Sequence, residues 1–309
     1  MTRTQRQQAL VLAATTLISA SGCAAAGSDE PVIVVTTNIL GDVVQNVVGD
    51  EAEVRVLMQP NADPHSFEIS AQDGAMMRRA DLIVTNGLGL EEGLQQHIDS
   101  ARSEDVPLLV AGEVIEPLDY ADGDSGGESE GAPDPHFWTD PALMADVVDE
   151  LEQQVLGIDG IDSEAVEAAA ATYQADLAEL DAAMTEAFAT IPADRRNLVT
   201  NHHVFGYLAE RYDFRIVGAV IPGGTTLASP SASDLRDLVA AIEEARVSTI
   251  FAESSQPDRL VQVLADGADL DVDVVELFTE SLTDPGEGAD TYLAMMRINT
   301  ERISTGLSP

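Results

Sequence analysis

Short apolar runs alternate with stretches of helical spacing along most of this chain. In the first half, runs rich in Val and Ile predict strands at 32–35, 54–57, 82–84 and 107–110. Between them, apolar residues recur every three or four positions over 40–48 and 90–97, which indicates helices. The second half repeats this scheme, with strands predicted at 197–200, 215–221, 249–252 and 272–277. Four strand–helix units per half predict an α/β protein of two lobes, each with a mainly parallel four-stranded sheet.

The longest helical pattern lies between the two halves, over residues 161–192. Asp162 or Ser163 can cap its start, and Pro192 cannot continue it. About 28 residues at ~1.5 Å each make a rod of roughly 40 Å, long enough to run across both lobes. We therefore expect one long interdomain helix, which makes wide hinge opening unfavourable. Its apolar positions are Val166, Ala170, Tyr173, Leu177, Leu180, Met184, Ala187 and Ile191.

The first residues read as a processing signal. Arg3 and Arg6 precede an apolar stretch over 9–19, which is shorter than the roughly 20 residues that a membrane-spanning helix needs. Small residues then precede Cys23, the pattern of a bacterial lipoprotein signal. We expect a lipid on Cys23 and a mature protein anchored to the outer face of the cytoplasmic membrane. An ordinary secretory signal with a spare thiol is the alternative.

Five segments follow from these patterns. They are a lipoprotein signal peptide at 1–22, a tether at 23–30, an N-terminal α/β lobe at 31–160, the linking helix at 161–192 and a C-terminal α/β lobe at 193–309. Within the first lobe, the acidic and glycine-rich segment 119–134 is predicted to be a mobile loop. Whether it passes cations to a nearby site or is only a solvated loop stays open.

The charge balance narrows the classes of partner. The chain has 55 acidic and 15 basic residues, a formal net charge of −40, which repels nucleic acid and anionic lipid and attracts cations. Genome-wide base composition or salt adaptation explains this bias as well as cation steering does. Every basic residue is Arg, so a P-loop lysine and a Schiff-base lysine are both excluded. A single cysteine excludes an intrachain disulfide and a thiolate-rich metal site.

Three histidines and one glutamate form a candidate metal site. Each follows the carboxyl end of a predicted strand, the edge at which open α/β sheets gather their ligands. Three imidazoles and one carboxylate are a complete ligand set for tetrahedral zinc. The sequence therefore predicts a metal held between the lobes. The four residues are His65 in Asp63-Pro64-His65, His136 in Asp134-Pro135-His136-Phe137-Trp138, His202 in Thr200-Asn201-His202-His203, and Glu280 in Phe278-Thr279-Glu280-Ser281.

Other residues are assigned supporting roles or none. Neighbouring residues near a strand end point in opposite directions, so we take His202 as the ligand and place His203 beside the site. A ligating imidazole donates its other N–H to an acceptor, and Glu68 and Glu253 are candidates for that acceptor or simply surface carboxylates. His97 lies in a polar helical stretch and is given no role.

With these motifs in their order and spacing, the chain resembles the zinc and manganese receptors of ABC transporters, the ZnuA-like group of substrate-binding proteins. The resemblance covers roughly residues 31–307 and implies two α/β lobes, one long helix and a metal at the lobe interface. It assigns the ligands to His65, His136, His202 and the position of Glu280. The family usually has Asp at that last position, so binding through one or both oxygens of Glu280 stays open. Further matching segments are Phe251-Ala252-Glu253-Ser254-Ser255 and Tyr292-Leu293-Ala294-Met295-Met296-Arg297-Ile298-Asn299.

The resemblance implies an extracytoplasmic receptor that captures Zn²⁺, one ion per chain, and delivers it to a permease and its ATPase subunit. We expect a monomer that binds no nucleic acid. Manganese is the alternative metal, but three imidazoles favour zinc because Mn²⁺ prefers oxygen ligands. A surface adhesin is a further alternative. A zinc hydrolase is not expected, because four protein ligands leave no position for water and no His-Glu-x-x-His motif is present.

Overall fold

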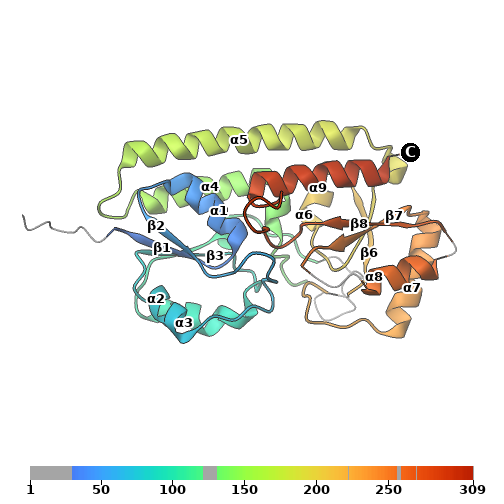
Figure 1. Cartoon of the computed structure of the whole chain (residues 1–309), viewed down its shortest axis with the longest axis horizontal. Coiled ribbons are helices and arrows are strands. Elements are labelled where there is room, and N and C mark those ends of the chain that lie inside the picture. Colours follow the sequence, from blue (N-terminus) through green and yellow to red (C-terminus); the bar gives the residue numbers. More distant parts are fainter. Residues whose placement is uncertain (1–29, 121–130, 222, 256–258, 269, 309) are drawn as a thin grey trace, which may run out of the picture.

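Two parallel sheets form the framework of the molecule. The computed structural model describes residues 30–120, 131–221, 223–255, 259–268 and 270–308. Within these residues the sheets have strand orders β2-β1-β3-β4 and β6-β5-β7-β8, and all paired strands are parallel. The predicted two-lobed α/β fold is therefore confirmed (Figure 1). The strands are β1 (Val32–Val35), β2 (Glu53–Val56), β3 (Leu82–Thr85), β4 (Leu108–Val110), β5 (Asn197–Thr200), β6 (Arg215–Ala219), β7 (Thr249–Glu253) and β8 (Asp273–Leu277).

The helices follow the strands in alternation. The N-lobe (β1 to α4) contains α1 (Asn38–Val48), α2 (Ala71–Met77), α3 (Gln95–Ser103) and α4 (Pro141–Val155), and the C-lobe (β5 to α9) contains α6 (Gly206–Tyr212), α7 (Ala232–Ala245), α8 (Arg259–Gly267) and α9 (Tyr292–Leu307). Helix α5 (Ser163–Ala189) connects the two lobes in sequence. Short 3-10 turns are η1 (Glu92–Leu94), η2 (Ala111–Glu113), η3 (Phe137–Thr139) and η4 (Ala193–Arg195).

The helix predicted at 90–97 begins later than its spacing suggested. Gly87, Leu88 and Gly89 all have positive φ, so the backbone turns sharply before α3. The buried Glu91 carboxylate then accepts hydrogen bonds from the amides of Asn86 and Gly87, at 2.7 and 3.0 Å. These contacts hold the segment in tight turns and in η1, and regular α-helix starts only at Gln95.

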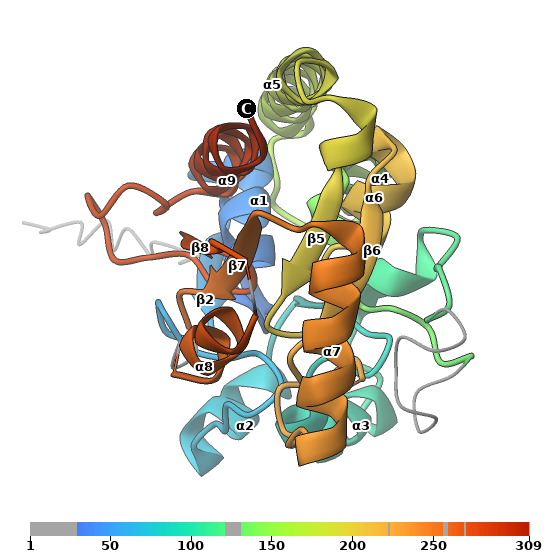
Figure 2. The same ribbon diagram turned by 90° about the vertical axis from the view of Figure 1, so that its right-hand side faces the viewer.

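Both faces of each sheet are covered, which explains why the strands are nearly continuous apolar runs. In β1, Ile33 and Val35 belong to the largest apolar core, whereas Val34 faces a smaller one that includes residues of α2 and α3. In the C-lobe, residues of α7 and α8 build the corresponding smaller core. Figure 2 shows α7 and α8 on the side of the C-lobe away from α5 and α9.

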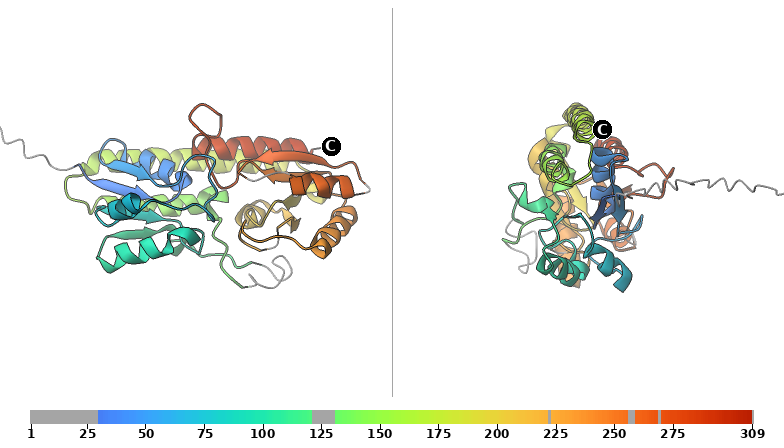
Figure 3. Two further views of the ribbon diagram at one scale, coloured as in Figure 1. Left: turned by 60° about the horizontal axis from the view of Figure 1, so that its bottom comes forward. Right: turned by 90° about the vertical axis from the view of Figure 1, so that its left-hand side faces the viewer.

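Helix α5 packs against α1 and α4 of the N-lobe and against α9 of the C-lobe. Figures 1 and 3 show it running over both lobes. The Asp162 side chain caps it by accepting from the amides of Glu164 and Ala165. Of the predicted apolar positions, Ala187 is only half-buried, and its neighbour Phe188 is buried instead; Ile191 is buried just beyond the end of the helix.

The largest core extends from the N-lobe through α5 into the C-lobe, so the two lobes share one apolar interior. Such a shared core opposes wide separation of the lobes. In the described part of the chain, no helix has the length and apolar character needed to cross a membrane. The predicted signal peptide, Cys23 and the tether up to residue 29 lie outside the described residues, as do residues 121–130 of the acidic segment. The ends of that segment pair, with Tyr120 N donating to Ala132 O at 3.0 Å.

Candidate metal centre

The two Asp-Pro-His motifs fold in the same way. In each, the Asp side chain accepts a hydrogen bond from the backbone N–H of the His two residues later, at 2.8 Å for Asp63 and His65 and 2.9 Å for Asp134 and His136. This is an Asx turn, and the intervening proline favours it because it has no N–H to compete. The turn therefore restrains the backbone at His65 and at His136, the residues that carry the imidazoles.

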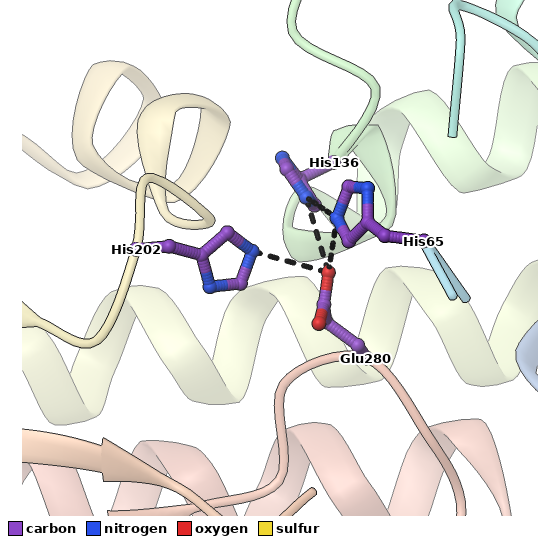
Figure 4. A group of neighbouring side chains, drawn as sticks. All are labelled: His65, His136, His202 and Glu280. Carbon is purple, nitrogen blue, oxygen red and sulfur yellow. Dashed lines mark hydrogen bonds and ion pairs between the residues drawn. The ribbon is translucent and has the colours of Figure 1, made fainter. Parts of the chain in front are cut away.

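The other two residues come from the C-lobe. His202 lies two residues beyond β5, where Thr200 Oγ1 donates to its backbone carbonyl at 2.7 Å. Glu280 lies three residues beyond β8. Both positions are at the carboxyl ends of parallel strands, so the sheet edge of the C-lobe faces the two histidines of the N-lobe (Figure 4).

The four predicted side chains converge on one point. Glu280 Oε1 lies 2.9 Å from His65 Nε2, 3.2 Å from His136 Nε2 and 3.1 Å from His202 Nε2. One atom from each residue lies within 4.8 Å of every other, and each of the four residues is at least 98% buried. A tetrahedral ion with bonds of about 2.0–2.1 Å needs ligand atoms roughly 3.3 Å apart. These spacings suit such an ion.

Two buried carboxylates orient two of the imidazoles. Asp134 Oδ1 lies 2.6 Å from His136 Nδ1, and Glu253 Oε2 lies 3.0 Å from His202 Nδ1. A carboxylate accepts, so the proton of each neutral ring sits on Nδ1 and the lone pair of Nε2 faces the centre. The predicted role of Glu253 agrees with this geometry. The sequence analysis missed Asp134, although its place in a repeated Asp-Pro-His motif was a usable signal.

The remaining predicted neighbours lie elsewhere. Glu68 is exposed, and within the described residues His65 Nδ1 has no hydrogen-bond partner, so Glu68 is placed as the surface carboxylate that was its alternative reading. His203 is buried and its ring lies 6.2 Å from that of Tyr120, whose hydroxyl is 3.4 Å from His136 Nδ1. His203 is thus one side chain removed from the cluster. His97 packs against Gly74 of α2 and is outside the group of four.

Buried charges of opposite sign stabilise one another within the cluster. Burial disfavours a charged imidazole at His202, but the carboxylates of Glu253 and Glu280 outweigh burial and raise its pKa well above 6.5. Burial acts in the same sense at His136, where Asp134 outweighs it and raises the pKa. Burial also favours neutral Glu280, yet the charges of His202 and His65 hold its pKa well below 4.5. The cluster therefore retains an anionic Glu280 together with positive charge on its imidazoles.

One buried oxygen of the cluster has no partner. Within the described residues, Glu280 Oε2 accepts no hydrogen bond, although it is shielded from solvent. An unpaired buried carboxylate oxygen is costly and calls for a cation or a water molecule at that position. The oxygen is thus available as a second contact to a metal bound through Oε1.

Replacing Glu253 with glutamine tests the orienting carboxylates. Glutamine can still accept from His202 Nδ1 but carries no charge, so Nε2 becomes a weaker donor to the metal. We expect zinc affinity to fall by about 10- to 100-fold, the usual cost of losing such a partner. Competition with a fluorescent chelator measures this change. The matched control is Glu68→Gln, which removes an exposed carboxylate and should leave affinity unchanged; equal losses in both variants would contradict the assignment.

Comparison with known proteins identifies the family of this chain and relatives with the same fold. The chain matches the family described as "Zinc-uptake complex component A periplasmic" over residues 33–306. It is 31% identical over 283 residues to the zinc-binding protein TroA of Treponema pallidum, covering 90% of this chain and 89% of that protein. It is 27% identical over 300 residues to the manganese ABC transporter substrate-binding lipoprotein PsaA of Streptococcus pneumoniae, covering 94% of each. The solved structure of the T. pallidum protein superimposes with a TM-score of 0.81 at 30% identity, over 91% of this chain and 100% of that one.

Proposed function

This chain belongs to the family of periplasmic zinc-uptake component A proteins, and on that premise we propose that it captures Zn²⁺ outside the cytoplasm and delivers it to a permease. It is a metal-binding receptor of the ABC-transporter type, as its relatives are. The observation that carries the proposal is the buried cluster of His65, His136, His202 and Glu280, whose ligand atoms meet within 4.8 Å.

The choice of zinc rests on the donor set. Three imidazole nitrogens and one carboxylate form a site that suits Zn²⁺, whereas Mn²⁺ prefers more oxygen donors and stands lowest in the divalent affinity series. Relatives named for zinc and for manganese match this chain at similar identity, so family membership alone does not select the metal. The second oxygen of Glu280 supports manganese as the alternative, because it would add an oxygen ligand.

Elemental analysis and competition titration test the proposal together. We expect about one zinc ion per purified chain and tighter binding of zinc than of manganese by the metal-free protein. Tighter binding of manganese would show that the receptor captures Mn²⁺ and not Zn²⁺. Failure to bind either ion would overturn the receptor function itself.

We further propose a membrane anchor at Cys23 and delivery to a permease with its ATPase subunit. Several relatives are named as lipoproteins of ABC transporters, which supports an extracytoplasmic, anchored protein. Palmitate labelling should occur in the wild type and be lost in Cys23→Ala. Labelling that persists in the variant would contradict a lipid on this residue. We propose that the receptor acts as a monomer.

Transport is favoured over catalysis and over adhesion. Four protein ligands fill a tetrahedral shell and leave no position for the water that a zinc hydrolase activates. The relatives from T. pallidum and S. pneumoniae are named as binding proteins, which supports the same conclusion. Growth of a deletion strain separates transport from adhesion: rescue by added zinc supports uptake, and normal growth with lost attachment supports an adhesin.

Zinc affinity should change with pH over a range that lies above the pH at which free histidine titrates. Because the pKa values of His202 and His136 are raised, protons remain on the cluster above pH 6.5 and zinc must displace them. Affinity should therefore rise by about tenfold per pH unit for each displaced proton, and the rise should continue above pH 6.5. Chelator competition at several pH values measures the slope, and calorimetry in buffers of different ionisation enthalpy counts the protons. Affinity that is constant above pH 6.5 would contradict the raised pKa values.

A further inference from the structure

The loop that carries Glu280 belongs to the C-lobe in sequence but is bound to the N-lobe. Before Glu280, the Thr279 carbonyl accepts from Trp138 Nε1 at 2.8 Å. After it, Ser281 Oγ accepts from Asn38 Nδ2 at 2.8 Å, and Leu282 N donates to Asn38 Oδ1 at 3.0 Å. The Leu282 carbonyl accepts from Asn61 N at 2.9 Å. The carboxylate is thus flanked on both sides by contacts to the other lobe.

Asn38 is the centre of this attachment. It is the first residue of α1, where Thr37 caps the helix, and its side chain is buried. Both ends of its amide form hydrogen bonds. Oδ1 accepts from Leu282 N, and Nδ2 donates to Ser281 Oγ and also to Gln59 O at 3.2 Å. Gln59 lies on the segment that leads from β2 to His65. Asn38 therefore connects the loop that carries Glu280 to the segment that carries His65.

His202 is held differently. Its backbone carbonyl accepts from Thr200 Oγ1, and its ring contacts Glu253, both within the C-lobe. The preceding Asn201 carbonyl accepts from Ile221 N at 2.7 Å, again within the C-lobe. The Glu280 loop also keeps links within the C-lobe, but they precede Glu280: Thr279 Oγ1 donates to Glu253 Oε1 at 2.7 Å, and the Phe278 backbone pairs with the Asn299 side chain of α9.

We propose that Asn38 is a positioning residue for Glu280, which holds the carboxylate against His65 and His136 so that three ligands stay assembled on the N-lobe. This inference rests on the proposed metal-receptor function. A carboxylate held in place loses little conformational freedom on binding the ion and is slow to move away. Without Asn38 the loop is free to shift, Leu282 N loses its buried acceptor, and the metal is released faster.

A double-mutant cycle in the full chain tests whether Asn38 acts through Glu280, with Zn²⁺ as the probe. Asn38→Leu should raise the rate of zinc release to a chelator by about 10- to 100-fold in the wild-type background. In the Glu280→Gln background it should change that rate by less than about twofold, because the group that Asn38 positions is already gone. In the His202→Ala background its effect should be retained in full. The Co²⁺ absorption spectrum should also report an altered ligand geometry in Asn38→Leu.

Two further variants keep the test decisive. Asn197 also donates from its side chain to a backbone carbonyl, that of Asp194 at 3.0 Å, but lies at the opposite end of β5 from His202, so Asn197→Leu should leave zinc release unchanged. Ser281→Ala removes one acceptor of Asn38 and should act in the same direction with a smaller effect, which serves if Asn38→Leu does not fold. An Asn38 effect of equal size with and without Glu280 would overturn the positioning role. A wild-type chain that does not bind zinc would instead overturn the proposed function.

Discussion

Replacement of His136 by alanine should weaken zinc binding on the order of 100- to 1000-fold. Structural zinc sites bind with about 10–16 kcal/mol, shared over four ligands, so each ligand accounts for two to three powers of ten. His136 is fully buried, and its Nε2 faces Glu280 Oε1 at 3.2 Å while Asp134 holds its other nitrogen. Chelator competition on the metal-free variant measures the loss, and His65→Ala should show a loss of the same order.

His97→Ala is the matched control for both substitutions. His97 is half-buried on α3 and lies outside the cluster, so its removal should leave zinc affinity unchanged. A convenient reporter is the fluorescence of Trp138, the single tryptophan of the chain, whose ring lies 5.2 Å from that of His136. Zinc should change this fluorescence in the wild type and in His97→Ala. Equal losses of affinity in all three variants would point to a nonspecific effect and not to a defined site.

Replacement of Glu280 by glutamine should weaken zinc binding on the order of 100-fold or more. The substitution keeps the shape of the side chain but removes the anion that all three imidazoles approach within 3.2 Å. Removing one partner from a buried charged cluster typically costs about 3–5 kcal/mol, and here the lost partner is also a ligand. The same titration, together with counting of metal per chain, measures the outcome.

Glu280→Asp is the control that separates charge from length. Aspartate retains the anion, so affinity should stay closer to that of the wild type than to that of Glu280→Gln. If the glutamine variant binds zinc as tightly as the wild type, the carboxylate is not a ligand. If the aspartate variant loses as much as the glutamine variant, the extra methylene of Glu280 is required for its reach.

Much of the fold and the four residues of the cluster could be predicted from local patterns. A β-strand or an amphipathic helix is encoded in the spacing of neighbouring residues, so the eight strands and α5 were recognisable. The Asx turns at His65 and His136 span only two residues and are equally local. His202 and Glu280 were recognisable because parallel strands present their carboxyl ends at one edge. The start of α3 was predicted too early, because the positive φ angles at Gly87–Gly89 turn the backbone before the helix begins.

The partners of these residues were decided by the tertiary structure. Glu68 is close to His65 in sequence but exposed, whereas Glu253 reaches His202 from 51 residues away. Asn38 binds Ser281 across 243 residues, and nothing near either residue in the chain indicates that contact. The physical reason is that a hydrogen bond acts over about 3 Å, so its partners depend on how the two lobes pack around their shared core. The sequence alone determined which side chains could form the cluster, and the packing of the lobes determined which groups hold them there.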